Sequence, residues 1–194
     1  MLRSTIIEIP SIETERAILR AHRPGDFDAY AEMWAAPEVT RFIGGYARTR
    51  DESWIRFLRH AGTWAMLGYG FWAIEDKASG RFIGEAGYHQ IFRNLTPSID
   101  GFPECGWALA PDMQGRGLAT EIVTAVVAWG DRTLGGQRQV CIIDRDNHAS
   151  IRLAGKCGFG NPVDARFGEG TVLLFERLPV TARIAAIDAE YLIR

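Results

Sequence analysis

The sequence has few of the residues that would indicate a metal site or a disulfide framework. Its 194 residues include three cysteines, with no Cys-x-x-Cys pair among them, and four scattered histidines. An odd number of widely spaced cysteines is typical of free thiols in a reducing compartment, so we expect a cytoplasmic protein. The histidines lack the spacing of zinc ligands, so no metal is expected.

Excess charge and long apolar runs are also missing. The formal net charge is only −2, which provides no basic surface for nucleic acid or for an anionic membrane. No apolar run approaches the roughly 20 residues that cross a bilayer, and the N-terminus lacks the apolar segment of a secretory signal. The sequence therefore predicts no nucleic-acid partner and no membrane partner, and it argues against recruiting a basic macromolecule by charge alone.

Hydrophobic spacing predicts an α+β fold, with mixed α/β connections, in one domain over residues 1–194. The expected helices begin near Asp26, near Asp51 or Ser53, at Leu118 and at Asn147. Because a hairpin is combined with strand–helix–strand crossovers, the sheet should be mixed. A C-terminal tail is expected over 181–194. The expected strands are 16–20, 70–75, 81–88, 103–109, 138–143 and 171–176.

The segment 111–121, Pro-Asp-Met-Gln-Gly-Arg-Gly-Leu-Ala-Thr-Glu, joins two glycines to the start of helical spacing. A helix start offers unpaired N–H groups and the positive end of a dipole, so this junction favours a phosphate group. It lacks the Gly-Lys-Ser/Thr of the Walker A motif, and Thr120 stands where a dinucleotide fingerprint needs Gly or Ala. A glycine-capped turn before an ordinary amphipathic helix is the alternative.

Read as Gln114-x-x-Gly117-x-Ala119, this segment resembles the acyl-CoA pyrophosphate loop of the GNAT N-acetyltransferase superfamily. The strand 104–109 before this loop and the segment 146–159 after it occur in the order found in that family. The Asn-x-x-Ser…Gly-Phe pattern of 146–159 is similar to that of the RimJ/RimL branch. The resemblance covers about residues 13–177, and it implies a GNAT-type central mixed, mostly antiparallel sheet flanked by helices.

The resemblance also implies acetyl-CoA as cosubstrate. Backbone N–H groups of the loop would hold the pyrophosphate, and the end of the preceding strand would meet the pantetheine arm and the thioester carbonyl. Arg116 would either contact a phosphate or remain a solvated loop residue, and Asn147 would cap its helix with or without contacting CoA. The expected cofactor-binding residues are Trp107, Ala108, Leu109, Gln114, Gly115, Arg116, Gly117, Leu118, Ala119, Thr120, Asn147 and Ser150.

Acetyl transfer to an amine also needs a proton acceptor, because an ammonium ion has no lone pair. Glu104, on the strand expected to pass the thioester, is the first candidate, Glu85 on the neighbouring strand is the second and His89 is the third. The alternative for each glutamate, and the more common state of a glutamate on a half-exposed strand, is a solvated or paired side chain, and the alternative for His89 is a plain surface residue. Many GNAT enzymes place a tyrosine four residues before Gly-Phe, where this chain has Ala154. Ser150 is then the nearest hydroxyl for protonating the thiolate, unless it only fills the first helical turn.

We therefore expect an acetyl-CoA-dependent N-acetyltransferase. The acetyl group would pass by direct attack on the thioester to a primary amine, on a protein N-terminus or on a small molecule. One alternative is a non-catalytic acyl-CoA-binding or sensing module, and another is a nucleotide-binding protein that uses the same loop. The loop 40–46 is a candidate lining of the acceptor pocket. The tail 181–194 is long enough to dock on a second copy, which leaves a homodimer open.

Overall fold

A computed structural model describes residues 8–179 of the chain. The chain forms two compact units, and each unit draws on two separate stretches of sequence. The first comprises Met1–His89 and Trp107–Ile122, and the second comprises Gln90–Gly106 and Val123–Arg194. The expected C-terminal tail, 181–194, lies outside the described residues.

Nine strands form a mixed, mostly antiparallel sheet in the order β1-β2-β3-β4-β6-β7-β9-β8-β5. Strand β6 (Glu104–Leu109) pairs in parallel with β7 (Gln139–Ile143), and the pairs β1–β2, β2–β3, β3–β4, β7–β9, β8–β9 and β5–β8 are antiparallel. The expected mixed sheet flanked by helices is confirmed.

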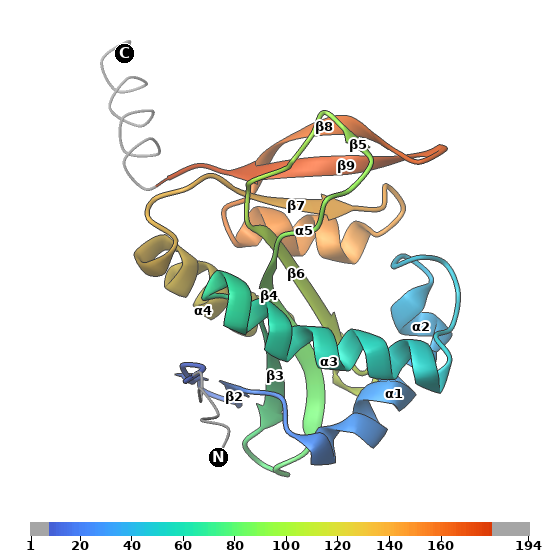
Figure 1. The fold of residues 1–194 in the computed structure, drawn as a ribbon, viewed down its shortest axis with the longest axis vertical. Helices are drawn as coiled ribbons and strands as arrows, with labels where there is room; N and C mark the ends of the chain where they lie inside the picture. The colour runs from blue at the N-terminus through green and yellow to red at the C-terminus, as the bar shows by residue number, and fades with distance from the viewer. Residues whose placement is uncertain (1–7, 180–194) are drawn as a thin grey trace, which may run out of the picture. The chain divides into compact units, whose positions relative to one another are not determined.

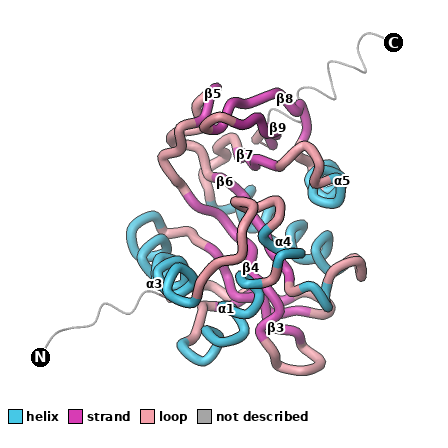
Figure 2. Tube along the Cα trace, turned by 90° about the vertical axis from the view of Figure 1, so that its right-hand side faces the viewer, coloured by secondary structure: helices cyan, strands magenta, loops and turns pink. Residues whose placement is uncertain are grey.

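The first unit contains a sheet with two helices on one face (Figures 1 and 2). Helix α3 crosses β3 and β4 in Figure 1, and both α1 and α3 lie to one side of these strands in Figure 2. The strands are β1 (Ile12–Glu13), β2 (Ala17–Arg20), β3 (Phe71–Asp76), β4 (Phe82–His89) and the second half of β6. The helical elements are η1 (Pro24–Asp26), α1 (Phe27–Ala35), α2 (Pro37–Thr40), α3 (Arg50–Leu67), η2 (Pro111–Met113) and the start of α4 (Leu118–Thr133).

Helix α3 begins slightly earlier than the sequence suggests, because Thr49 rather than Asp51 or Ser53 is its N-cap. The Thr49 side chain accepts from the backbone N–H of Glu52, whose carboxylate accepts from the N–H of Thr49, so the two form a capping box. The helix ends at Gly68, which has a φ of 72°. This well-defined start and stop fixes which α3 side chains face the sheet.

Aromatic side chains of α1 and α3 form the core of the first unit. Tyr30 and Trp34 on α1 and Phe57 on α3 pack with the strand residue Phe82, and Ala108 of β6 belongs to the same cluster. Rings of this size bury much apolar area and meet here mostly edge-on or tilted. The core therefore reaches the strand end that the sequence assigns to the thioester.

The second unit is built on the remaining strands. These are β5 (Leu95–Thr96), the first half of β6, β7, β8 (Gly160–Phe167) and β9 (Gly170–Arg177). Helix α5 (His148–Lys156) lies beside β7 in both views (Figures 1 and 2). Leu95, Ile99, Val140, Ala165 and Leu174 form the core of this unit.

Strands β1, β5 and β8 were not expected from the sequence. In β8, four consecutive residues from Asn161 to Asp164 are exposed, so the strand lacks the alternating buried pattern that identifies a half-buried strand. Asn161 has a φ of 50°, and the register against β9 shifts between Gly160 and Val163. Across residues 8–179, no helix has the length and apolar character needed to cross a membrane.

Candidate active site

The loop between η2 and α4 has the conformation that its glycines allow. Gly115 and Gly117 have φ values of 75° and 74°, in the left-handed region that other residues avoid. The Gln114 side chain donates from Nε2 to the carbonyl oxygen of Leu109 at 3.0 Å, which ties the loop to the end of β6. The loop residues 114–117 are exposed, so the start of α4 is accessible to a ligand.

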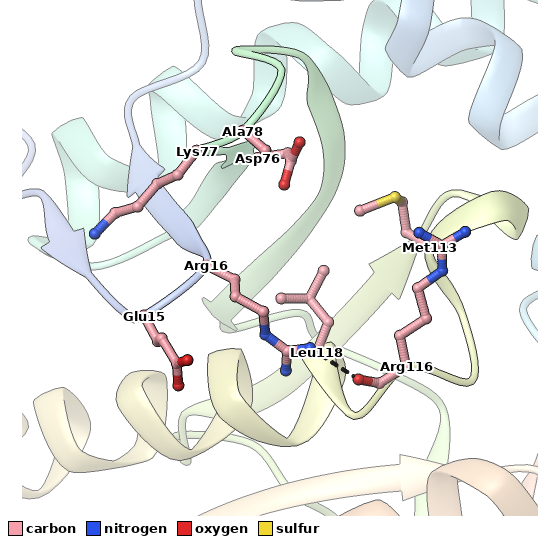
Figure 3. Close-up of a pocket in the computed structure, with 8 residues that line it drawn as sticks. All are labelled: Glu15, Arg16, Asp76, Lys77, Ala78, Met113, Arg116 and Leu118. Carbon is pink, nitrogen blue, oxygen red and sulfur yellow. Dashed lines mark hydrogen bonds between the residues drawn. The ribbon is translucent and has the colours of Figure 1, made fainter.

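Arg16 holds the loop from the side of β2. Its backbone N–H and its Nε donate to the Glu121 carboxylate at 2.8 and 2.7 Å, and its Nη1 donates to the carbonyl oxygen of Arg116 at 2.9 Å (Figure 3). Partial burial opposes ionisation of Glu121, but hydrogen bonds from Thr14 and Arg16 hold its pKa below the usual value. The loop is thus fixed at its glycines, at Gln114 and at the first turn of α4.

A pocket lies on the β2 side of this loop. Figure 3 shows the Arg16 guanidinium directed at the loop. The Arg116 side chain extends away from the loop toward Met113. The pocket combines side chains of both charges with apolar side chains. Its lining residues are Glu15, Arg16, Asp76, Lys77, Ala78, Met113, Arg116 and Leu118.

The end of β6 lies tightly against β4. A Cβ atom at Gly84 would lie 2.4 Å from the carbonyl oxygen of Ala108, so only glycine permits this approach. The N–H of Ala110 donates to the carbonyl of Ile83 at 2.9 Å, and Ala108 and Leu109 are buried while Trp107 is half-buried. The segment 107–109 is therefore held firmly next to the residue that precedes Glu85.

Glu85 lies in the middle of β4 and its carboxylate is fully buried. Arg56 Nη2 donates to Oε1 at 3.1 Å, and His60 Nε2 lies 2.8 Å from Oε2. His22 Nε2 lies 3.7 Å from the same Oε2, and its ring stacks on His60 at 4.3 Å with an angle of 6° between the rings. The Tyr30 hydroxyl is 3.1 Å from His60 Nε2. We call these five side chains the Glu85 cluster.

Burial and charge set the protonation of the Glu85 cluster. Burial opposes ionisation of Glu85, but His60 and Arg56 outweigh it and hold the pKa of Glu85 well below its usual value. Burial lowers the pKa of His60 and raises that of Tyr30. Near pH 7 Glu85 is therefore a carboxylate paired with the Arg56 guanidinium, and Tyr30 is protonated.

His22, His60 and Glu85 offer three ligand atoms within 4.8 Å of one another, which raises the question of a metal. An imidazole binds a metal along the lone pair in its ring plane. Since the His22 and His60 rings are stacked and nearly parallel, their in-plane lone pairs do not converge on one point. Arg56 also brings a positive charge to the same carboxylate. The cluster is poorly arranged for a cation.

His89, the third candidate base, ends β4 in the first unit, whereas Glu104, Asn147 and Ser150 lie in the second unit. Glu104 is buried, and Arg93 binds both of its carboxylate oxygens at 2.8 and 3.0 Å. Asn147 is the N-cap of α5, with its side-chain oxygen accepting from the N–H of Ser150 at 3.1 Å. The capping role is confirmed. A CoA contact of Asn147 and proton donation by Ser150 stay predictions.

The sequence did not indicate that His22, Arg56 and His60 surround Glu85, or that Arg16 fixes the loop. These residues belong to separate segments, and nothing in their spacing connects them. One signal was available for the cluster. Glu85 lies in a strand of otherwise uncharged residues from Phe82 to Tyr88, and a charge buried in such a strand needs a partner.

Comparison with known proteins matches these features to one family. The model of the "Acetyltransferase (GNAT) domain" family matches residues 16–160. The chain belongs to this acetyltransferase family. The match includes β2, the Glu85 cluster, the glycine loop and the Asn147 cap.

Individual relatives agree with this family assignment. The chain is 30% identical over 151 residues to the uncharacterized N-acetyltransferase YoaA of Bacillus subtilis, and the alignment covers 77% of this chain and 82% of YoaA. A structure from Bordetella pertussis, described as a GnaT-family acetyltransferase, is 36% identical with a TM-score of 0.77, covering 87% of this chain and 99% of that one. An Agrobacterium tumefaciens acetyltransferase is 27% identical with a TM-score of 0.74, covering 90% and 97%.

Proposed function

We propose that this acetyltransferase moves an acetyl group from acetyl-CoA to a primary amine, on a protein N-terminus or on a small molecule, by direct attack on the thioester. The observation that carries the proposal is the exposed loop 114–117, with two left-handed glycines at the start of α4. Loop N–H groups and the helix dipole there favour a pyrophosphate. Arg16 keeps this conformation in place from outside the loop.

Two proteins that share the fold show what it can bind. RimL, a ribosomal L7/L12 alpha-N-protein acetyltransferase, was solved with coenzyme A, and AAC(6')-Ib was solved with an aminoglycoside and acetyl-CoA. At 16% and 18% identity they share only the fold with this chain. They support acetyl-CoA as the cosubstrate and leave both acceptor classes in the proposal, with a RimJ/RimL-like protein N-terminus as one of them.

The segment 107–109 is proposed to bind the thioester end of the cosubstrate. A backbone N–H of Ala108 or Leu109 would stabilise the oxyanion that forms when the amine nitrogen attacks the carbonyl carbon. The Leu109 carbonyl is already occupied by Gln114, so the strand end is fixed before the cosubstrate arrives. Such fixed donors need no rearrangement during the reaction.

The proton acceptor is proposed among the two buried carboxylates named from the sequence, and their surroundings differ. Arg93 occupies both oxygens of Glu104. Arg56 donates a hydrogen bond to only one oxygen of Glu85, and the other faces two imidazoles. Since a general base must have a free lone pair within reach of the proton, the surroundings of Glu85 favour proton transfer more than those of Glu104.

Thiol release from acetyl-CoA tests the proposal. The amine panel contains tripeptides with N-terminal alanine or serine, an aminoglycoside and a polyamine. We expect thiol release above the rate of acetyl-CoA hydrolysis with at least one amine, and a mass increase of one acetyl group on that amine. CoA binding without turnover on the whole panel would instead indicate an acyl-CoA-binding module, and displacement of CoA by ATP or NAD would indicate a nucleotide-binding protein.

A further inference from the structure

The pocket beside the glycine loop has a volume of about 430 Å³ and is distinct from the segment proposed for the thioester. Pockets that hold small organic ligands measure roughly 300 to 1,000 Å³, so this one has room for a nucleoside. Its walls come from three segments of the first unit, which are 15–16 before β2, 76–78 in the β3–β4 turn and 113–118 around the loop (Figure 3).

The pocket is continuous with the loop. Met113 lines it just before the exposed residues 114–117, and Leu118 lines it just after them. Arg16 also lines the pocket, and a Cβ atom on Gly117 would lie 3.9 Å from Arg16 Nη2. A ligand with its pyrophosphate on the loop therefore has this pocket directly beside it.

The chemistry of CoA then leaves one group for the pocket. The pyrophosphate of CoA joins the pantetheine arm to an adenosine that carries a 3′-phosphate. Since the proposed function directs the pantetheine arm to the segment 107–109, the opposite end of the molecule remains. This end needs an apolar surface for a ring, acceptors for an amino group and hydroxyls, and a cation for a phosphate.

The pocket offers the first two of these. Met113 and Leu118 present apolar surface, and Glu15 and Asp76 provide carboxylates that can accept from the adenine amino group or from a ribose hydroxyl. Hydrogen bonds from Ser79 hold the pKa of Asp76 below its usual value, so Asp76 is an acceptor at neutral pH. Mixed lining of this kind suits a nucleoside better than a bare anion.

Three cations line the pocket, and they differ in their availability. Lys77 Nζ donates to the carbonyl of Thr14 at 2.6 Å and to the carboxylate of Glu13 at 3.2 Å. Arg16 is held by the loop contacts described above. The guanidinium of Arg116 makes no hydrogen bond or ion pair with any residue in the range 8–179, and Figure 3 shows this side chain on the pocket side of the loop. It is therefore the cation that a phosphate can engage.

We propose that this pocket binds the 3′-phosphoadenosine end of CoA, with Arg116 paired to the 3′-phosphate and the adenine ring against Met113 and Leu118. This inference rests on the proposed function, because it takes the loop as the pyrophosphate site. A guanidinium matches a phosphate in charge and geometry. The enzyme should then select acetyl-CoA over acetyl thioesters that end at 4′-phosphopantetheine, such as those carried on a protein.

The 3′-phosphate contact is tested by calorimetric titration of the full chain with CoA, 3′-dephospho-CoA and 4′-phosphopantetheine. We expect wild type to bind CoA about 10-fold more tightly than 3′-dephospho-CoA, the value of one charge-assisted pair. Arg116→Gln should remove this preference by weakening CoA alone. Arg132→Gln changes an exposed arginine in the last turn of α4 and should keep the wild-type preference.

The position of the adenosine is tested on the wild-type protein by NMR. Adenosine 3′,5′-bisphosphate should shift the backbone amide signals of Lys77 and Ala78 in the β3–β4 turn, whereas 4′-phosphopantetheine should leave them in place. Gly168, in the exposed turn between β8 and β9, is the control amide and should not move with either compound.

The possible results separate this inference from the proposed function. Equal weakening of CoA and 3′-dephospho-CoA in Arg116→Gln would assign Arg116 to the pyrophosphate and overturn the 3′-phosphate contact. Unchanged signals at Lys77 and Ala78 would overturn the pocket as the adenosine site. Tight CoA binding without thiol release on any amine would refute only the transfer reaction, whereas no CoA binding by the wild-type chain would refute both.

Discussion

At the scale of single residues, the glycine loop depends on backbone freedom rather than on space. A Cβ atom at Gly117 would meet only Arg16 Nη2, at 3.9 Å, yet its φ of 74° is strained for any other residue. Gly136 has a nearly equal φ of 72° with no atom within 4 Å, and it lies in a turn outside the candidate site. The two positions therefore form a matched pair.

We predict that Gly117→Ala and Gly136→Ala each lower the free energy of unfolding by about 1 to 2 kcal/mol, the cost of a left-handed backbone. Only Gly117→Ala should also weaken CoA binding, because it alone changes the direction of the loop N–H groups. Urea denaturation and calorimetric titration with CoA measure the two effects. Equal CoA affinity in both variants would count against the loop as the pyrophosphate site.

Another residue-scale contrast concerns two acid–arginine pairs in the first unit. Asp26 is buried and accepts from two nitrogens of Arg20, at 2.7 and 2.8 Å, whereas the Asp28–Arg50 pair is exposed. Burial opposes ionisation of Asp26, but Arg20 outweighs it and lowers the pKa of Asp26. Because the folded pKa is depressed, this stabilisation is present above the unfolded pKa and is lost as the pH falls through the folded pKa.

Asp26→Asn is predicted to lower the free energy of unfolding at pH 7 by about 1.5 to 3 kcal/mol, since it weakens two charge-assisted hydrogen bonds and leaves Glu75 as the remaining carboxylate on the Arg20 guanidinium. It should also reduce the loss of stability between pH 5 and pH 2. Asp28→Asn, in the exposed pair, is predicted to change stability by less than about 1 kcal/mol. Urea denaturation across this pH range measures both, and similar losses in the two variants would contradict the burial argument.

At the scale of elements, two helices begin at side-chain caps of the same kind. Thr49 caps α3 in the first unit and Asn147 caps α5 in the second, each by accepting from a backbone N–H three residues later. Removing either cap is expected to cost about 1 kcal/mol. Asn147 is also expected to contact the cosubstrate, whereas Thr49 is not, so cosubstrate binding distinguishes the two caps.

Thr49→Ala and Asn147→Ala should therefore lower Tm by similar amounts, while only Asn147→Ala raises the KM for acetyl-CoA. Thermal unfolding and initial rates with the best amine of the panel provide the comparison. If both variants keep the wild-type KM, Asn147 only caps its helix.

The sequence identified elements where local signals agree, and it failed where they do not. The glycine loop was recognisable because Gly115, Gly117 and the helical spacing after them lie next to one another. Strand β8 was missed because its exposed residues and the left-handed Asn161 look like a loop, and only pairing with β9 makes it a strand. The Glu85 cluster could not be predicted, since the connection after β2, helix α3 and strand β4 bring His22, His60 and Glu85 together only after folding.

At the scale of the whole molecule, the two units are interleaved in the sequence. Each consists of two stretches, and β6 contributes Glu104–Gly106 to one unit and Trp107–Leu109 to the other. Neither unit can therefore be completed by one continuous stretch of chain. This arrangement is consistent with the single domain expected from the sequence, which stays a prediction.

We predict one cooperative unfolding transition, which two sets of natural probes can follow separately. Five of the six tryptophans belong to the first unit and Trp129 belongs to the second, so the Trp129→Phe variant restricts tryptophan fluorescence to the first unit. The buried thiols of Cys105, Cys141 and Cys157 all belong to the second unit. Tryptophan fluorescence and thiol labelling should give the same urea midpoint. Two separate midpoints would show that the units unfold independently.

The Arg16 hydrogen bonds extend the influence of the loop to the beginning of the fold. Arg16 directly precedes β2, and its backbone N–H donates to the Glu121 carboxylate. Any ligand that stiffens the first turn of α4 must also slow opening of that hydrogen bond, because linkage between two sites is reciprocal. Amide exchange at Arg16 would then report occupancy of the loop from a position about 100 residues earlier in the sequence.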